Sequence, residues 1–367
     1  MSRHALFISC ALVVACGSEA PSGPSVDLDS GETAGADTSD AASDLPLDTA
    51  EDADLDPDPA GPLRFDQIQT LGTHNSYHVL VGSPADPSHD YTHPPLATQL
   101  DAGVRHFELD VHRAPDGGPH RVYHIVGIDP GTSCELLSDC LTQIRDWSLA
   151  HPRHHLIVVL IEPKDDIATI FADIGQDPKQ SGEDLWAGQI ATLDPVIADV
   201  FEPRHLLTPT SFRARSAAPT VRESLENRGF PTLAETRGKV ALVLNDTSAQ
   251  RAEYRAAGEG LMFVFGEVGD DDVAFVKADD PRSNPARIRD AVTRGYVVRT
   301  RADADLEIDI ERRDAALSSG AQLVTTDFPH QSPPESGYGV WLDGGAPSRC
   351  NPVSAPPGCD DSVIEPR

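Results

Sequence analysis

Residues 71–78, LGTHNSYH, place His74 and Asn75 directly behind a short apolar run. Polar residues in a row at the end of a strand do not help to build a core. A His-Asn pair at such a position is commonly a turn or a capping element. The alternative is that these residues form the first part of a reaction centre whose other parts lie further along the chain.

Two carboxylates follow in the segment VRHFELDVH, residues 104–112. Because side chains alternate between the two faces of a strand, Glu108 and Asp110 share a face with His106 and His112. Two carboxylates inside a barrel repel each other unless a cation binds them. This pair therefore predicts a cation site, although an exposed edge strand also produces the pattern Glu-x-Asp.

A third carboxylate lies near the end of HLIVVLIEPK, residues 155–164. One face of this strand is apolar until its last two positions, Glu162 and Lys164. Three carboxylates and the side-chain oxygen of Asn75 are hard donors, which suit Ca²⁺ in a loose arrangement or Mg²⁺ in a tighter octahedral one. Cysteine and histidine do not dominate the set, so the residues argue against zinc.

The elements that must position these groups alternate between apolar, β-rich runs and amphipathic helical stretches. Such alternation is typical of parallel strands joined by crossover helices. Eight strands in roughly 260 residues predict an α/β fold of the (β/α)8 TIM-barrel type, whose catalytic residues lie at the C-terminal ends of the strands. An open doubly wound sheet is the alternative, but no G-x-G-x-x-G follows any strand. The expected strands are 68–73, 104–111, 156–162, 239–245, 261–266, 273–277, 296–300 and 322–327, with an extra extended piece at 121–125. The expected helices are 134–150, 184–201, 284–295 and 310–321.

The motifs T-H-N-S-Y, F-E-L-D-V-H, V-Y-H and L-I-E, in this order and spacing, resemble the X-region of phosphoinositide-specific phospholipases C. The resemblance covers residues 68–165 and is closest to the calcium-dependent bacterial secreted group. The later stretches FVKADDP, YVVRTRADA and VTTDFP also look like that group. The animal enzymes add membrane-binding and calcium-sensing modules that this sequence does not show, and their second barrel half matches poorly. Head-group contacts are therefore not carried over.

The resemblance implies catalytic roles for His74 and His124, which would flank the phosphate, and Ca²⁺ binding by Asn75, Glu108, Asp110 and Glu162. The chemistry accounts for these residue types, because phosphodiester cleavage needs an activated nucleophile, charge relief and a proton donor. The expected nucleophile is the ring 2-hydroxyl of phosphatidylinositol. The expected products are diacylglycerol and inositol 1,2-cyclic phosphate, part of which water would open to the 1-phosphate.

Other polar residues at strand ends have two readings each. Lys164, Lys277 and Arg299 either bind phosphate and inositol hydroxyls or are ordinary charged strand ends. Asp327 either orients a base or caps a turn. The cluster His151, His154 and His155 lies between a helix and a strand, at the opposite end of the barrel, so we interpret it as a loop and not as a metal tract.

Competing functions remain open from the sequence. Glycerophosphodiester phosphodiesterases and sphingomyelinase-D-like enzymes use similar groups on the same barrel, and Glu162-Pro163-Lys164 resembles their E-x-K pattern. The start T-H-N-S-Y argues against the former, which have His-Arg-Gly there. A lipid- or surface-binding lipoprotein with an inactive barrel is the alternative from another class. It would have no reason to keep several mutually repelling groups inward.

The N-terminus predicts export. Arg3 and His4 precede an eleven-residue apolar run that is too short to span a bilayer and ends in V-V-A-C, similar to a lipoprotein lipobox. We therefore expect a signal peptide at 1–16 with Cys16 lipidated, and an anchored lipoprotein or an extracellular or periplasmic protein. A plain signal peptide cleaved nearby is the alternative.

Residues 17–62 are rich in Gly, Ser, Ala, Thr, Pro and Asp and predict a disordered acidic linker. The first 62 residues hold 13 of the 59 acidic residues of the chain, whose net charge is −30. The catalytic domain is expected at 63–330 and a Pro/Gly-rich surface tail at 331–367. The acidity of both parts argues against nucleic acid as a partner and against simple electrostatic attraction to an anionic membrane. We expect a monomeric protein that acts on a phosphatidylinositol-type lipid at a membrane surface.

Four cysteines remain outside the signal region. In an oxidising compartment the economical pairing is two local disulfides, Cys134 with Cys140 and Cys350 with Cys359, although sequence alone does not fix the connectivity. A zinc site is the rival interpretation, but neither pair has C-x2-C spacing.

Overall fold

A computed structural model of the protein describes residues 58–246, 249–329, 334 and 336–365. The predicted signal sequence, Cys16 and the linker up to residue 57 lie outside the described residues. In the described part of the chain, no helix is both long and apolar enough to cross a bilayer.

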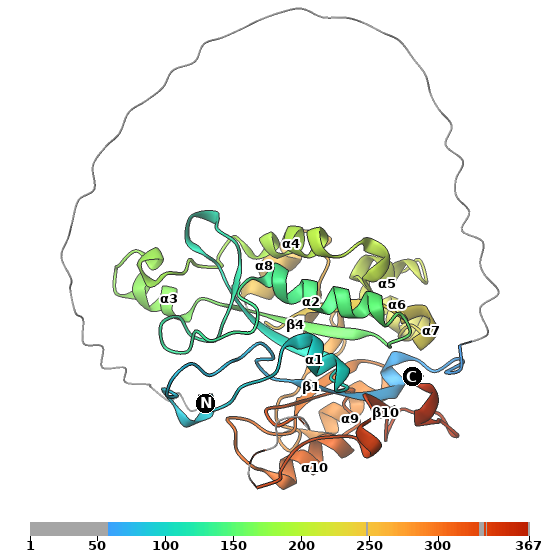
Figure 1. Cartoon of the computed structure of the whole chain (residues 1–367). Helices are drawn as coiled ribbons and strands as arrows, with labels where there is room; N and C mark the ends of the chain where they lie inside the picture. The colour runs from blue at the N-terminus through green and yellow to red at the C-terminus, as the bar shows by residue number, and fades with distance from the viewer. Residues whose placement is uncertain (1–57, 247–248, 330–333, 335, 366–367) are drawn as a thin grey trace, which may run out of the picture. The chain divides into compact units, whose positions relative to one another are not determined.

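Eight parallel strands form a closed barrel, as predicted (Figure 1). The barrel closes because β1 pairs with β9 on one side and with β2 on the other. The eight strands are β1 (Ile68–Thr73), β2 (His106–His112), β4 (Ile157–Lys164), β5 (Val240–Leu244), β6 (Phe263–Phe265), β7 (Val273–Lys277), β8 (Val297–Arg301) and β9 (Leu323–Thr326). The extended piece predicted at 121–125 is the short strand β3 (Arg121–Val122), which pairs antiparallel with β2.

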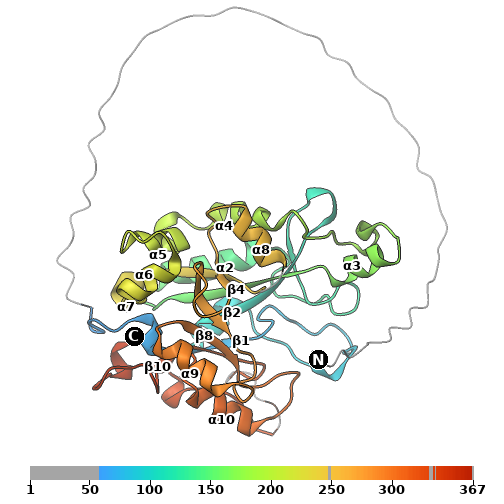
Figure 2. The same cartoon turned by 180° about the vertical axis from the view of Figure 1, so that it is seen from behind.

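The helices surround the strands. Helices α2 and α4–α7 lie on one side of the barrel, and α9 and α10 lie on the other side (Figures 1 and 2). Several begin at a residue whose side chain accepts a backbone N–H, such as Thr220 before α6 and Asn284 before α9. The helices are α1 (Leu96–Asp101), α2 (Leu137–Ala150), α3 (Asp166–Asp173), α4 (Leu193–Val200), α5 (Pro209–Ala214), α6 (Val221–Arg228), α7 (Leu233–Thr236), α8 (Ala249–Ala256), α9 (Pro285–Thr293) and α10 (Ile310–Ser318).

The helix predicted at 184–201 is wrong in its first part. A short 3-10 turn begins only at Ile190, and α4 begins at Leu193. The preceding segment is held in place by Trp186, whose buried indole N–H lies 3.2 Å from the carbonyl oxygen of Val111 and 3.1 Å from that of Lys164. These bonds tie the loop to the ends of β2 and β4, so a helix there would lose them.

Gly72 allows β1 and β2 to approach each other closely. It pairs with His106 across the seam, and a Cβ at position 72 would lie 2.1 Å from the His106 ring. Toward the start of β1, residues Ile68–Thr70 pair with β10 (Ser348–Cys350), which runs antiparallel to β1. The glycine of LGTHNSYH therefore makes the closure of the barrel possible.

The C-terminal segment is built into the fold, in contrast to the predicted surface tail. Besides strand β10, it contributes Ile364, which is completely buried, and Glu365, which forms an ion pair with the buried Arg105. The two predicted disulfides, Cys134–Cys140 and Cys350–Cys359, are both present. The domain boundaries themselves stay a prediction.

Candidate active site

Three carboxylates meet at the C-terminal ends of β2 and β4. Asp110 lies directly opposite Glu162 in the parallel pairing of the two strands, so both side chains point to the same face. One oxygen from each of Glu108, Asp110 and Glu162 lies within 4.8 Å of the others. The structure thus places together the three acidic residues that the sequence pattern predicted as metal ligands.

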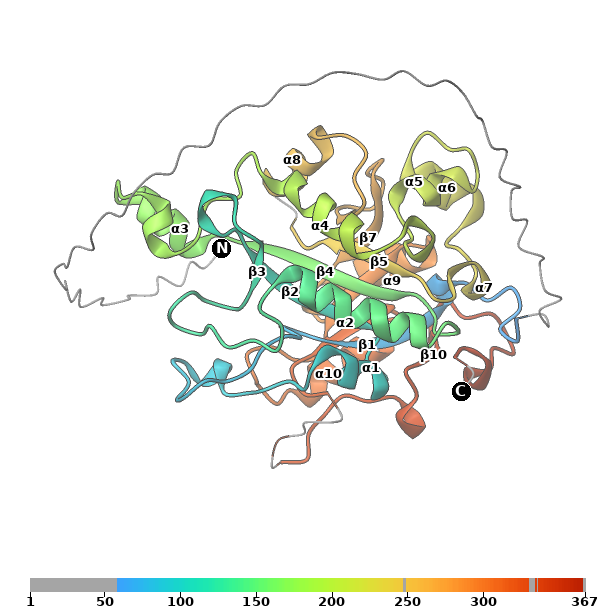
Figure 3. The ribbon, with the colours of Figure 1, turned by 45° about the horizontal axis from the view of Figure 1, so that its top comes forward.

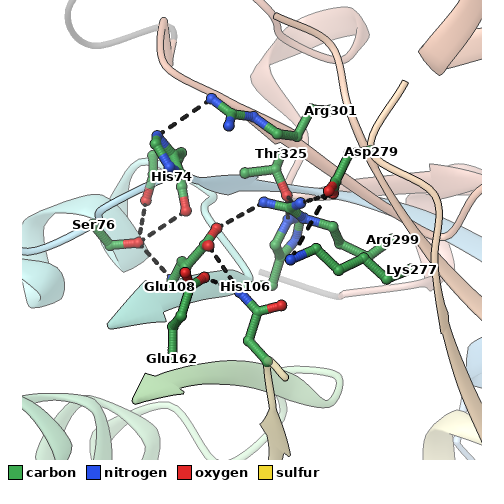
Figure 4. A network of polar contacts seen from close by, with 12 residues as sticks. His74, Ser76, His106, Glu108, Glu162, Lys277, Asp279, Arg299, Arg301 and Thr325 are labelled. Carbon is green, nitrogen blue, oxygen red and sulfur yellow. Dashed lines mark hydrogen bonds and ion pairs between the residues drawn. The ribbon is translucent and has the colours of Figure 1, made fainter. Parts of the chain in front are cut away.

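Glu108 is paired with a buried arginine. Its Oε2 accepts a hydrogen bond from Nη2 of Arg299 at 2.7 Å, and both side chains are at most 4% exposed (Figure 4). Burial opposes the charge of Glu108, but the Arg299 guanidinium outweighs it and holds the pKa of this carboxyl below its usual range. One member of the carboxylate group is therefore charged without any metal ion.

Asp110 and Glu162 have a different environment. Burial, together with the neighbouring carboxylates, raises the pKa of both above the usual range, although Lys164 partly offsets this. Lys164 Nζ lies 2.6 Å from Glu162 and 3.8 Å from Asp110. Oδ1 of Asp110 is buried and has no hydrogen bond of normal geometry among the described residues. The Tyr77 hydroxyl faces this carboxylate, is also buried, and likewise has no hydrogen bond of normal geometry there.

A hard divalent cation fits this donor set. A buried oxygen without a partner costs free energy, which a cation at this position would recover. The available donors are carboxylate oxygens, which Ca²⁺ prefers, and no histidine or cysteine belongs to this group. Ca²⁺ is the ion whose flexible coordination the three converging side chains suit best.

Asn245 is a site residue that the sequence analysis did not single out. Its Nδ2 donates to Oε1 of Glu108 at 2.9 Å and to Oε2 of Glu162 at 2.5 Å. Its own Oδ1 is buried and has no hydrogen-bond partner in the described part of the chain. Asn245 is the last residue of the predicted strand 239–245, so a polar residue ending an apolar strand was the available signal.

His74 is held by two charged residues from the last strands. Its Nδ1 lies 2.9 Å from Oδ1 of Asp327, and Nη2 of Arg301 lies 3.1 Å from the same oxygen. Burial opposes the charge of Asp327, but His74 and Arg301 lower the pKa of this carboxyl. This contact with His74 is compatible with the first predicted role of Asp327, the orientation of a base, which stays a prediction. The His74 side chain remains 24% exposed, so its ring is accessible to a ligand.

His124, like His74, is held at Nδ1 by an aspartate. Its Nδ1 lies 2.9 Å from Oδ2 of Asp129, and the side chain is 22% exposed. Asp129 also lies 2.9 Å from Nε2 of the buried His78. Burial lowers the pKa of His124, and the hydrogen bond to Asp129 partly counteracts this. Asp129 was not predicted, and no feature of the sequence marks it as a partner of His124.

The segment after β1 is tied to the strand of carboxylates. The Ser76 hydroxyl accepts the backbone N–H of Glu108 at 2.9 Å, and the Ser76 N–H donates to the Glu108 carbonyl at 3.0 Å. Asn75, between His74 and Ser76, is buried and has a positive φ of 42°, which asparagine tolerates better than most residues. Asn75 therefore lies at the junction of the two strands that carry His74 and Glu108, and its role as a metal ligand stays a prediction.

The remaining residues that were predicted to contact the substrate differ in their exposure and in the partners that they already have. Arg299 is 1% exposed, and Glu108, Asp279 and Thr325 occupy its guanidinium, so it supports the site from below (Figure 4). Lys277 is partly exposed and lies 3.9 Å from Asp279. His154 and His155 are buried before β4, at the opposite end of the barrel from the carboxylates, which agrees with their interpretation as a loop.

Comparison with known proteins adds a family. The sequence profile described as "Phosphoinositide phospholipase C, Ca²⁺-dependent" matches residues 63–121 and 119–352. Among solved structures, a calcium-dependent phosphoinositol-specific phospholipase C from a Gram-negative Pseudomonas species has a TM-score of 0.55 at 19% identity, over 80% of this chain and 97% of that one. The enzyme from Streptomyces antibioticus has a TM-score of 0.53 at 19% identity, over 72% of this chain and 95% of that one. At these identities the two structures support the barrel fold.

A curated relative from Mycobacterium tuberculosis strain H37Rv is an uncharacterized protein, 31% identical over 229 residues. The match covers 59% of this chain and 38% of the relative. The chain thus matches about two fifths of the length of that relative.

Proposed function

Because this chain belongs to the Ca²⁺-dependent phosphoinositide phospholipase C family, we propose that it cleaves phosphatidylinositol to diacylglycerol and inositol 1,2-cyclic phosphate. The observation that carries the proposal is the combination of the three converging carboxylates with two histidines, each held at Nδ1 by a carboxylate. This set supplies the cation site and the proton-transfer groups that phosphodiester cleavage requires.

Glu108, Asp110, Glu162 and Asn75 hold the Ca²⁺. When bound, the ion lowers the pKa of the inositol 2-hydroxyl and neutralises charge on the phosphate. Glu162, which is partly exposed at the end of β4, is the carboxylate best placed to accept the proton of that hydroxyl. Asn245 and Arg299 keep Glu108 and Glu162 in position from the side opposite to solvent.

The two histidines act on the phosphate and on the leaving group. His124 donates a proton to the diacylglycerol oxygen. Asp129 binds Nδ1 of His124, so the other ring nitrogen, Nε2, points away from this carboxylate. His74 hydrogen-bonds the phosphoryl oxygen as negative charge builds on it, with Asp327 and Arg301 fixing its ring. Lys164 and Lys277 supply additional positive charge at the same end of the barrel.

Exposed apolar side chains support action at a membrane surface. Among the residues that the structure describes, six of the eight large exposed apolar ones lie on segments that leave the C-terminal ends of strands, where the carboxylates are: Val81, Ile128, Ile170, Ile174, Ile308 and Ile310. Helix α3, which carries Ile170 and is followed directly by Ile174, projects beyond the barrel (Figure 3). Since the domain is acidic, apolar insertion and not electrostatic attraction holds it at the lipid.

Export and anchoring complete the proposal. Two disulfides fit an oxidising compartment. The signal sequence with the lipobox at Cys16 then anchors a monomeric enzyme to a membrane through an acidic linker. The rival activities, glycerophosphodiester cleavage and sphingomyelinase-D-like cleavage, would use the same carboxylates without requiring an inositol 2-hydroxyl.

A substrate panel tests this function. The purified protein is incubated with phosphatidylinositol, sphingomyelin, lysophosphatidylcholine or glycerophosphocholine, with Ca²⁺ or with EGTA. We expect Ca²⁺-dependent release of diacylglycerol from phosphatidylinositol alone. Choline or ceramide phosphate as the main product would assign one of the rival activities, and absence of any turnover would favour a binding protein.

A further inference from the structure

We propose that His89, His124 and Asp129 form a second metal site, separate from the carboxylates and specific for a borderline transition metal ion such as Zn²⁺. Each of the three residues offers a ligand atom, and these atoms lie within 4.8 Å of one another. They come from two segments: His89 ends the 3-10 turn Pro87–His89, and His124 and Asp129 lie five residues apart in the connection between β3 and α2. The fold brings His89 to the loop that carries the other two residues.

The distances suit a tetrahedral ion. Oδ2 of Asp129 lies 2.9 Å from Nδ1 of His124 and 3.6 Å from Nδ1 of His89. Ligand atoms each about 2.0–2.1 Å from a tetrahedral zinc ion are about 3.3 Å apart, which lies between these two values. The two imidazole rings meet edge to face, with centroids 4.8 Å apart, so neither ring covers the other.

One of these ligand atoms lacks a hydrogen bond. Nδ1 of His89 is buried and makes no hydrogen bond to any part of the chain that the structure describes. A ring nitrogen in this condition is costly unless a ligand occupies it. The side chains of His89 and His124 are 12% and 22% exposed, so solvent and a small ion can reach the site.

Asp129 is already oriented for such a role. Nε2 of His78 lies 2.9 Å from its Oδ1, and Nδ1 of His78 lies 3.0 Å from the carbonyl oxygen of Tyr91. His78 Nε2 is also 2.9 Å from Oδ2, the oxygen that faces His89 and His124, so His78 holds the whole carboxylate in position. Hydrogen-bonded partners of this kind orient ligands in metal sites.

The two sites differ in the ion that they prefer. Two imidazoles and one carboxylate favour Zn²⁺, Ni²⁺ or Cu²⁺, whereas the set Glu108, Asp110 and Glu162 contains oxygen donors only and favours Ca²⁺. Three protein ligands leave one tetrahedral position for water. Because Ca²⁺ prefers oxygen donors, millimolar Ca²⁺ should not displace the transition metal ion from the two imidazoles.

Occupation of this site would inhibit catalysis, a consequence that rests on the proposed function. A metal ion on Nδ1 of His124 replaces the proton that this nitrogen shares with Asp129. The ring then carries a proton on Nε2 only and can no longer exist as the imidazolium that donates to the leaving oxygen. Loss of a general acid lowers the rate by about 10²–10⁴-fold.

Co²⁺, with its visible absorption, is the probe. The metal-free full-length protein is titrated with Co²⁺ in saturating Ca²⁺, and Zn²⁺ is added afterwards. We expect one equivalent of Co²⁺ with the intense absorption of tetrahedral coordination, which Zn²⁺ abolishes by displacement. His89→Ala and the size-matched His89→Gln should each weaken this binding at least about tenfold. His205→Ala, on a turn remote from the site, should not change it.

The absorption is independent of enzymatic activity. If the protein does not cleave phosphatidylinositol but shows the tetrahedral spectrum, the metal site stands and the proposed function fails. A weak octahedral spectrum, or wild-type Co²⁺ affinity in both His89 variants, would overturn the metal site. If the function holds, both His89 variants should keep wild-type Ca²⁺-dependent turnover and lose the inhibition by Zn²⁺, which also shows that they are folded.

Discussion

Nη2 of Arg299 lies 2.7 Å from Oε2 of Glu108, and both residues are at most 3% exposed. Glu108 also accepts a hydrogen bond from Asn245 and is one of the three carboxylates proposed to bind Ca²⁺. This buried pair therefore connects the barrel interior to the carboxylate site. Removing one partner of a buried ion pair leaves an uncompensated charge. The pair therefore makes the stability of the fold depend on what occupies the carboxylate site.

Arg299→Met should destabilise the protein by about 3–5 kcal/mol in EGTA, because Glu108 loses its counter-charge. In saturating Ca²⁺ the loss should be clearly smaller, since the ion supplies positive charge to the same carboxylate. Urea unfolding in both conditions measures this. Arg222→Met, which removes an exposed partner of Asp271, is the matched control and should show no Ca²⁺-dependent difference. Equal losses for Arg299→Met with and without Ca²⁺ would contradict the link between this arginine and the metal site.

His124→Ala should reduce kcat on phosphatidylinositol by about 10²–10⁴-fold, because it removes the proton donor for the leaving oxygen. Ca²⁺ affinity, measured by calorimetry, should stay close to wild type, since His124 is not among the carboxylate ligands. A substrate with a good leaving group, such as a nitrophenyl inositol phosphate, needs less protonation and should recover much of the loss. Near-normal turnover on phosphatidylinositol would remove His124 from the mechanism.

Ile170→Ser combined with Ile174→Ser should weaken binding to phosphatidylinositol vesicles by on the order of 10- to 100-fold, because two partly exposed apolar side chains no longer enter the lipid. Ile170 lies in α3, and Ile174 is the C-cap residue four positions further along the chain. Vesicle sedimentation measures the effect. Turnover of a soluble, short-chain substrate should not change. Leu149→Ser, at the C-terminal end of α2, removes a similarly exposed residue from the other end of the barrel and serves as control. An equal effect of Leu149→Ser would show that α3 is not the docking surface.

His154→Gln should change the pH dependence of stability. Burial lowers the pKa of His154 from 6.5 to about 4 in the folded protein. Below pH 6.5 the unfolded chain therefore takes up a proton that the folded protein does not, so acid favours unfolding. Relative to the variant, the wild-type free energy of unfolding should fall by about 1.4 kcal/mol per pH unit between pH 6.5 and 4. Parallel curves for the two proteins across this window would show that the ring is not held neutral.

The barrel could be predicted because its strands are short and rich in apolar or β-branched residues, and because helical stretches separate several of them. Strand β4 illustrates this: its first five residues, Ile157–Ile161, are completely buried, and only its end is charged. The same rule located Glu162 and would also have located Asn245, which follows the apolar strand β5. Polar residues that end apolar strands were thus the most informative signal in the sequence.

Contacts between distant segments could not be predicted. Asp129 contacts both His124, five residues away, and His78, fifty-one residues away, and His78 in turn stacks on Tyr91. Strand β10 has three residues, too few to show a period, and its partner β1 lies at the other end of the domain sequence. Both features follow from the assembled fold and leave no local pattern.

Phosphorus NMR of the reaction with phosphatidylinositol tests the central claim most directly. The claim is that the inositol 2-hydroxyl, and not water, attacks the phosphorus while Ca²⁺ is held by Glu108, Asp110 and Glu162. With Ca²⁺ present, inositol 1,2-cyclic phosphate should be the first new signal, and any inositol 1-phosphate should follow it with a delay. Inositol 1-phosphate that forms from the start without a cyclic precursor, or a cyclic product that forms equally fast in EGTA, would contradict the account.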